Sequence, residues 1–86
     1  MIRAVIFAQG ELWIAQAIEH DISIDALTCN DAVNRLDSVI DVERVRCAEL
    51  GRDLDLIPPA PETFARMWEA ARSPIHFDGQ FYWRAI

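Results

Sequence analysis

The residues best suited to chemistry lie in one short stretch of the chain. Glu19, His20 and Asp21 are consecutive, and Asp25 follows four positions after Asp21. A two-metal nuclease needs carboxylates that converge on ions about 4 Å apart, and a histidine beside them could act as a base. The plainer interpretation is that these are solvated acids of a turn, because exposed carboxylates are common on protein surfaces. A third interpretation is that they contact a basic partner.

Other reactive side chains lack the spacing of a known kind of site. His20, His76, Cys29 and Cys47 do not form the closely spaced pairs of a structural zinc site. No serine or cysteine has an evident relation to either histidine, so each is interpreted as an ordinary surface residue. The three glycines are too far apart for a phosphate-binding loop. The sequence therefore predicts no metal and no cofactor.

The composition favours a small acidic protein that binds other proteins. Its 86 residues make a single domain, and 52% of them are hydrophobic, which is rich for a chain that buries only part of its surface. The net charge is −6, and all eight basic residues are arginines. The negative electrostatic potential of such a chain repels phosphate backbones and favours basic partners. Direct DNA binding is therefore not expected, whereas contact with another chain is.

The two cysteines and the lack of long apolar runs indicate a cytoplasmic protein. Cys29 and Cys47 are eighteen residues apart on one predicted helix, so their Cα atoms would lie about 27 Å apart, too far for a disulfide. Both are expected to be free thiols in a reducing compartment. The start of the chain lacks the apolar run of a signal peptide, and no segment reaches the length of a membrane span.

A long helix over residues 28–50 organises the predicted fold. Thr28 suits the N-cap, Asp31 suits the first turn, and Gly51 suits the left-handed position after the helix. Apolar residues recur at steps of three and four and form one stripe, which needs a sheet to cover it. The stripe comprises Cys29, Val33, Leu36, Ile40, Cys47 and Leu50.

The residues before this helix predict that sheet. Apolar runs at 2–8, 12–18 and 22–27, joined by short polar turns, predict a three-stranded antiparallel meander. The third run alternates cleanly, with Ile22, Ile24 and Ala26 on one face. The first two runs are apolar on both faces, so both faces must be covered. The second cover must come from the C-terminal third or from another protomer.

The C-terminal third predicts an extended connector at residues 52–61, which we call the strap, then a helix and an aromatic tail. Residues 52–61 contain three prolines within four positions and predict an extended connector. A helix follows to about residue 72, with Phe64 and Trp68 on its apolar side. Asp78-Gly79 between short apolar runs predicts a hairpin or an extended tail. Tyr82 and Trp83 cannot both point inward from a strand, which leaves one face for a partner.

Residues 2–50 resemble the N-terminal domain of the HicB-like antitoxins. The resemblance rests on the order of an apolar strand, the Gly10-Glu11 turn, the strand WIAQA with Trp13, the turn at residues 19–22, a third strand, and Thr28 opening a long helix. It implies a partial ribonuclease-H-like fold without nuclease activity. It also implies a partner, a small basic mRNA-cleaving toxin of the HicA type, which the domain binds and masks.

The chain departs from the HicB-like pattern in its C-terminal part, and it also differs from the ribonuclease-H enzymes. Full-length relatives add a DNA-binding module, but only one helix follows Gly51 here, and a helix-turn-helix needs two in close succession. Ribonuclease-H enzymes carry an essential acid in the first strand, and residues 2–8 contain none. We therefore expect neither DNA binding nor catalysis.

The sequence thus predicts one α+β domain, a meander packed by one long helix with a C-terminal helix and tail, divided as 1–51, 52–61 and 62–86. The leading hypothesis is a non-catalytic, self-associating antitoxin that neutralises a basic toxin. The alternative is a stand-alone homo-oligomeric regulatory or ligand-binding module. The predicted partner-binding residues are Trp13, Glu19, Asp21, Asp25, Tyr82 and Trp83.

Overall fold

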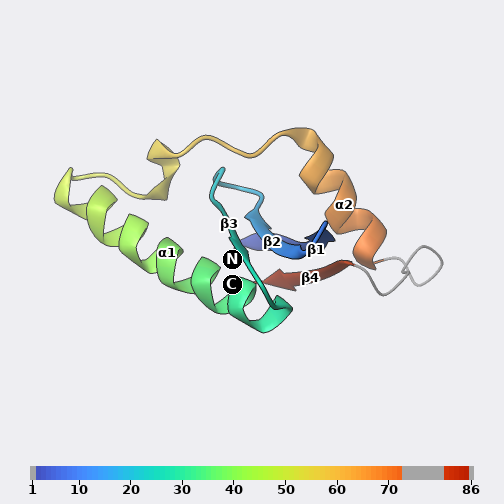
Figure 1. Ribbon diagram of the computed structural model, residues 1–86. Coiled ribbons are helices and arrows are strands. Elements are labelled where there is room, and N and C mark those ends of the chain that lie inside the picture. The colour runs from blue at the N-terminus through green and yellow to red at the C-terminus, as the bar shows by residue number, and fades with distance from the viewer. Residues whose placement is uncertain (1, 73–80, 86) are drawn as a thin grey trace.

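The computed structural model describes residues 2–72 and 81–85, the last part and residues 71–72 by their backbone alone. The chain folds into an α+β unit in which the long helix lies on one face of a sheet and a second helix lies on the other (Figure 1). The elements in chain order are β1 (Arg3–Gln9), β2 (Leu12–Ala17), β3 (Ser23–Ala26), α1 (Cys29–Glu49), the 3-10 helix η1 (Leu54–Leu56), α2 (Glu62–Arg72) and β4 (Phe81–Ala85).

The predicted meander is present and gains a fourth strand. The sheet order is β3-β2-β1-β4, and every neighbouring pair is antiparallel. β4 pairs with the free side of β1, so the aromatic tail extends the sheet. The sequence predicted a hairpin or an extended tail here, because a pairing between the two ends of the chain leaves no local pattern. Residues 73–80, which hold the predicted hairpin turn, lie outside the described residues.

The caps of α1 explain why this helix begins and ends as predicted. The Thr28 hydroxyl accepts a hydrogen bond from the Asp31 backbone N–H at 3.1 Å. At the other end Gly51 has φ +70°, a left-handed conformation that favours glycine. Its N–H donates to Ala48 O at 2.9 Å, and the Arg52 N–H donates to Cys47 O at 2.9 Å. These two bonds form a Schellman motif and close the helix.

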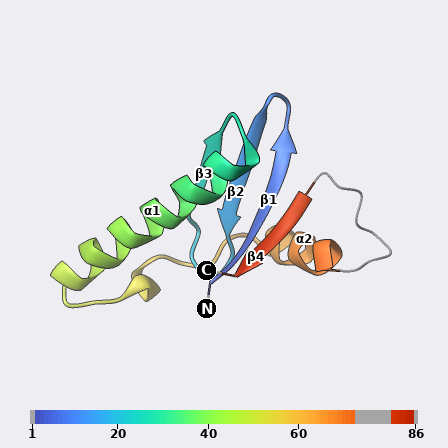
Figure 2. The same ribbon diagram turned by 90° about the horizontal axis from the view of Figure 1, so that it is seen from below.

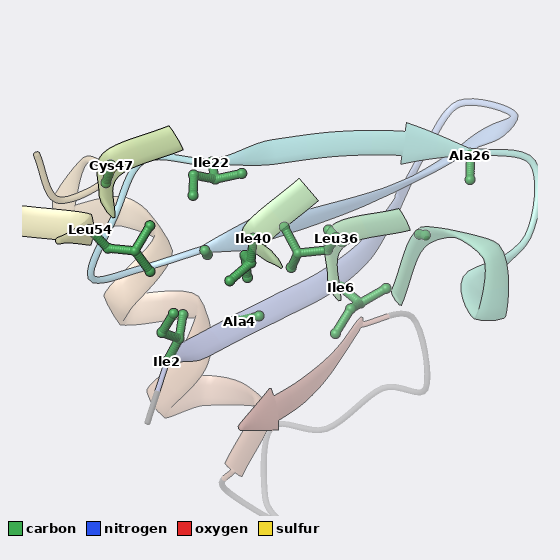
Figure 3. Packing of buried hydrophobic residues seen from close by; sticks show 12 residues of the cluster. Ile2, Ala4, Ile6, Ile22, Ala26, Leu36, Ile40, Cys47 and Leu54 are labelled. Carbon is green, nitrogen blue, oxygen red and sulfur yellow. The ribbon is translucent and has the colours of Figure 1, made fainter. Parts of the chain in front are cut away.

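One core cluster lies between the sheet and α1. Leu36 and Ile40 reach from the helix toward Ile6 of β1 and toward Ile22, just before β3 (Figure 3). The predicted stripe is confirmed up to Cys47, which is fully buried. It is wrong for Leu50, which is 62% exposed, because this residue is the C-cap of a helix whose last turns project past the sheet (Figure 2).

A second, smaller cluster lies on the opposite face of the sheet, under α2. Trp68 packs there against Val5 and Ile18, and all three are buried. Phe64 stacks on Phe7, with ring centroids 6.2 Å apart. The second cover is thus supplied by the C-terminal third, one of the two sources predicted. α2 packs against β1 and β4, and farther along this face Leu12 of β2 is 37% exposed.

The proline strap connects the two faces by crossing the turn between β2 and β3. The Asp21 N–H donates to Pro58 O at 2.7 Å, and the Ala60 N–H donates to Ile18 O at 2.9 Å. The strap therefore acts as a rigid connector that places α2 on the far face. Within the described ranges, neither helix combines the length and apolar content needed to cross a bilayer.

Candidate protein-binding surface

The acids of the turn after β2 bind other parts of the chain. The Glu19 carboxylate accepts hydrogen bonds from the Arg3 backbone N–H and from Arg3 Nε, the latter at 2.7 Å. Asp21 Oδ1 accepts from the side-chain amide of the buried Gln16 at 3.0 Å. These two predicted partner-binding residues therefore hold the turn in place. Glu19 and Asp21 are available to a partner only through those parts of their side chains that remain exposed.

The histidine of this turn is also held by the fold. His20 Nδ1 lies 3.1 Å from Ile57 O in the strap, so this nitrogen carries the hydrogen and donates. Nearby is a hollow of about 400 Å³, where the start of β1 meets the end of α1 and η1. Its lining mixes charges of both signs: Glu19, His20, Arg44, Arg52, Asp53 and Asp55. Such a lining does not favour a ligand of one charge.

The acids do not converge on a common point. Asp25 lies on β3, opposite Ile14, and is exposed. Among residues 2–72 and 81–85, no group of three or more histidine, cysteine, aspartate or glutamate side chains is close enough together to hold a metal ion. These acids thus form no metal-binding cluster among the described residues, and Asp21 and Asp25 are exposed whereas Glu19 is half-buried.

The six predicted partner-binding residues occupy different parts of the sheet. Trp13 is half-buried and packs against the α1-side core, near Asp25 in the strand pairing. Glu19 and Asp21 lie at the other end of β2. Tyr82 and Trp83 take register positions opposite Ile6 and Val5, on the strand farthest from β3. Their side chains lie outside what the structure describes.

The outer edge of β3 is the surface that the structure adds to these predictions. The Ala17 N–H donates to Ile22 O at 2.9 Å, which makes this a hydrogen-bonded pair of the β2–β3 ladder. Because such pairs alternate in antiparallel sheets, Ile24 and Ala26 also bond inward to β2. The backbone groups of Ser23 and Asp25 therefore point outward, away from the sheet.

A groove runs along this edge beneath α1. Two hollows, of about 810 and 500 Å³, share Ser23 and Val39 in their lining and so adjoin. The first is lined by Ile14, Ser23, Ile24, Asp25, Asp31, Asn34, Arg35, Ser38 and Val39. The second is lined by Asp21, Ile22, Ser23, Val39, Glu43, Arg46 and Ile57. We call this combined surface the β3 groove.

The β3 groove carries more acids than bases. Four of its lining residues are acidic and two are arginines. Arg46 bridges to Glu43 at 2.6 Å, and this hydrogen bond raises the pKa of Arg46. Arg35 Nη1 donates to the outward Asp25 carbonyl at 3.2 Å. The carboxylates of Asp25 and Asp31 make no ion pair with the described residues, which leaves the groove acidic.

Sequence reasoning found Asp21 and Asp25 but missed the rest of the groove. Ser23, Asp31, Arg35 and Val39 come from a strand and a helix whose relative placement no local pattern contains. The sequence did indicate that the third strand could be an edge strand, because a short terminal strand of a meander has one unpaired side. The fourth strand joined at β1, and β3 therefore stayed an edge.

Both cysteines are free, as predicted. Cys47 is buried, and Cys29 at the start of α1 is partly buried. Burial raises the pKa of the Cys29 thiol. At neutral pH a raised pKa lowers the fraction of Cys29 present as thiolate, which slows its reaction with electrophiles.

Three comparisons with known proteins found no match. A scan against protein-family models gives no match, and neither the curated proteins nor the solved structures contain a significant match.

Proposed function

We propose that this protein is a non-catalytic, HicB-like antitoxin that binds and masks a small basic mRNA-cleaving toxin of the HicA type in the cytoplasm. The observation that supports the proposal is the arrangement of β1, β2, β3 and α1, which follows the order that the resemblance of residues 2–50 implies. The charge agrees with it, because a chain of net charge −6 attracts basic proteins.

In this proposal the protein inactivates the toxin by covering its surface. Glu19 and Asp21 are held by Arg3 and Gln16 within the fold, a structural role that requires no metal. A purified chain should therefore cleave no RNA with divalent metal present. The Asp21→Asn variant should likewise cleave none. Metal-dependent cleavage lost in Asp21→Asn would refute the non-catalytic part of the proposal.

DNA binding is assigned to a further module rather than to this fold. α1 and α2 pack on opposite faces of the sheet and are separated by the strap, so they do not form a helix-turn-helix (Figure 1). Repression of an operon would need another chain or domain.

The alternative is a stand-alone homo-oligomeric regulatory or ligand-binding module. It is favoured by apolar side chains on the solvent side of α1, where Val42 is 64% and Val45 60% exposed. These valines could contact a second copy without any toxin. The two functions differ in the partner that occupies the protein in the cell.

The deciding experiment is co-expression with the product of the adjacent gene. We expect a small basic chain that co-purifies with this protein and whose RNA cleavage is suppressed by it. Light scattering of the mixture should give the mass of a hetero-complex. If the neighbouring gene encodes no such chain, or if the pair elutes separately, the antitoxin proposal fails and the homo-oligomeric module is favoured.

A further inference from the structure

We infer that the β3 groove accepts an extended basic segment of a partner protein as an additional strand of the sheet. The inference rests on the proposed function for the class of partner, and it names the surface and the binding mode. Strand addition at an exposed sheet edge is a recurrent way of binding peptides, in which main-chain hydrogen bonds supply affinity and side-chain pockets supply specificity.

The main chain of β3 provides the first part of the argument. Ser23 and Asp25 point their N–H and C=O groups outward, and β3 has no strand on this side within the described chain. Among residues 2–72 and 81–85, nothing pairs with the Ser23 N–H, the Ser23 C=O or the Asp25 N–H. The Asp25 carbonyl is covered by Arg35, whose exposed side chain can swing away when a strand arrives. An arginine at this place protects the edge from unwanted pairing.

The side chains along the groove specify the sequence that would fit. On the α1 side of β3 lie Ile22, Ile24 and, on the helix above, Val39. On the other face Ser23 and Asp25 pair with Gln16 and Ile14 of β2. An added strand should therefore alternate, with apolar residues toward α1 and a basic residue opposite Asp25, since opposite charges across a strand pair stabilise it.

The same chemistry argues against a second copy in this groove. β3 itself reads Ser-Ile-Asp-Ala and contains no basic residue. A second β3 would bring another Asp25 into a groove that already has four acids and two arginines. A basic strand reduces this excess of negative charge, whereas a copy of β3 increases it.

The test uses the full chain, labelled for amide NMR, and a capped peptide of about seven residues in which arginine and valine alternate. We expect its addition to shift the amide resonances of Ser23 and Asp25 most. A glutamate-valine peptide of the same length is the control and should leave them unchanged. Equal binding of both peptides, or shifts centred elsewhere, would overturn the inference.

A proline variant isolates the main-chain contribution. Ser23→Pro removes an N–H that the β2–β3 ladder does not use, so edge proline is tolerated. We expect peptide binding to weaken about tenfold in Ser23→Pro and less than about twofold in Ser23→Ala. If Ser23→Pro does not fold, the wild-type chain and a peptide N-methylated on alternate residues give the same comparison. Unchanged affinity in that comparison would exclude strand addition.

A second variant tests the role of Arg35. Arg35→Ala uncovers the Asp25 carbonyl and removes a positive charge from the groove, so the arginine-valine peptide should bind more tightly. Arg44→Ala, on the same helix but outside the groove, is the control. Weaker binding in Arg35→Ala than in Arg44→Ala would contradict the inference.

The results separate this inference from the proposed function. If a co-purifying basic toxin binds Ser23→Pro as well as wild type, the antitoxin proposal stands and the strand-addition inference fails. If the peptide docks on β3 but no toxin is found, the groove is a strand acceptor and the antitoxin proposal fails. Concentration-dependent protection of the Ser23 and Asp25 amides without peptide would show a second copy in the groove and would overturn the choice of occupant.

Discussion

At the scale of single residues, the side chains that look reactive in the sequence are used to hold the chain together. Glu19 binds both the backbone and the side chain of Arg3, and Asp21 binds Gln16. Arg3 also lies over the ring of Trp68, 5.7 Å from its centroid, and so links the turn to α2. Glu19 and Asp21 therefore have a structural role that the sequence alone does not reveal.

The first prediction concerns Glu19. Glu19→Ala should lower the free energy of unfolding by about 1–2 kcal/mol, because it leaves the Arg3 N–H and Nε without their acceptor in a partly exposed site. Glu62→Ala removes a looser pair, 3.6 Å from Arg66 on the surface, and should change stability by less than about 0.5 kcal/mol. Urea unfolding measures both. Equal effects would mean that the Glu19 contacts contribute no more than a surface pair.

The second prediction concerns the thiols. Cys47 is fully buried and should resist iodoacetamide until the protein unfolds. Cys29 should react in the native state, but more slowly than free cysteine at neutral pH, because its raised pKa leaves less thiolate. Its rate should rise about tenfold per pH unit below that pKa. Mass spectrometry after timed quenching follows each site, and rapid native labelling of Cys47 would contradict the packing of α1.

At the scale of elements, α2 determines how much of the sheet is available to partners. The first two strands are apolar on both faces, and α2 buries Val5 and Ile18 on the face that α1 leaves open. On that face the part near Leu12 stays exposed and is available to a partner. The free edge of β3 is better suited to binding a partner than the face under α2, because α2 does not cover the unpaired main chain of β3.

The third prediction tests the cover that α2 provides. Trp68→Ala should destabilise the protein by about 3–5 kcal/mol, since it removes the buried centre of the far-face cluster. It should also increase binding of a hydrophobic dye as the far face opens. Arg66→Ala, on the exposed side of the same helix, is the control and should be nearly neutral. A small effect of Trp68→Ala would mean that α2 is not needed to cover the sheet.

At the scale of the whole molecule, the shape is elongated, with extents of 43 × 24 × 17 Å. The C-terminal half of α1 projects past the edge of the sheet (Figure 2). Three large apolar residues on this part of the chain are exposed: Val42, Val45 and Leu50. Val42 and Val45 are three positions apart and so share one side of the helix, where exposed apolar side chains favour a contact between chains.

The fourth prediction is self-association through this projection. Sedimentation at micromolar concentration should show a dimer or a larger species, and replacing Val42 and Val45 together by serine should shift it toward the monomer. Leu27→Ser, an exposed apolar residue just before α1, is the control and should leave the mass unchanged. A wild-type monomer at every concentration would refute the prediction.

Local patterns in the sequence determined the elements of this protein. The cap at Thr28, the left-handed Gly51, the period of α1 and the alternation of residues 22–26 each depend on neighbours along the chain, and the structure has all of them. The same reasoning identified Asp25 as an exposed acid. It failed at Leu50, where the periodic pattern continues past the end of the sheet that the helix packs on.

The tertiary structure alone decided what covers the sheet and which edge stays open. The pairing of β4 with β1 joins residues from opposite ends of the chain, and the strap carries α2 to the far face through hydrogen bonds to the β2–β3 turn. These contacts depend on the free energy of packing between distant segments, which no short window of sequence contains. The β3 groove exists because that packing completed one side of the sheet and left the other unpaired.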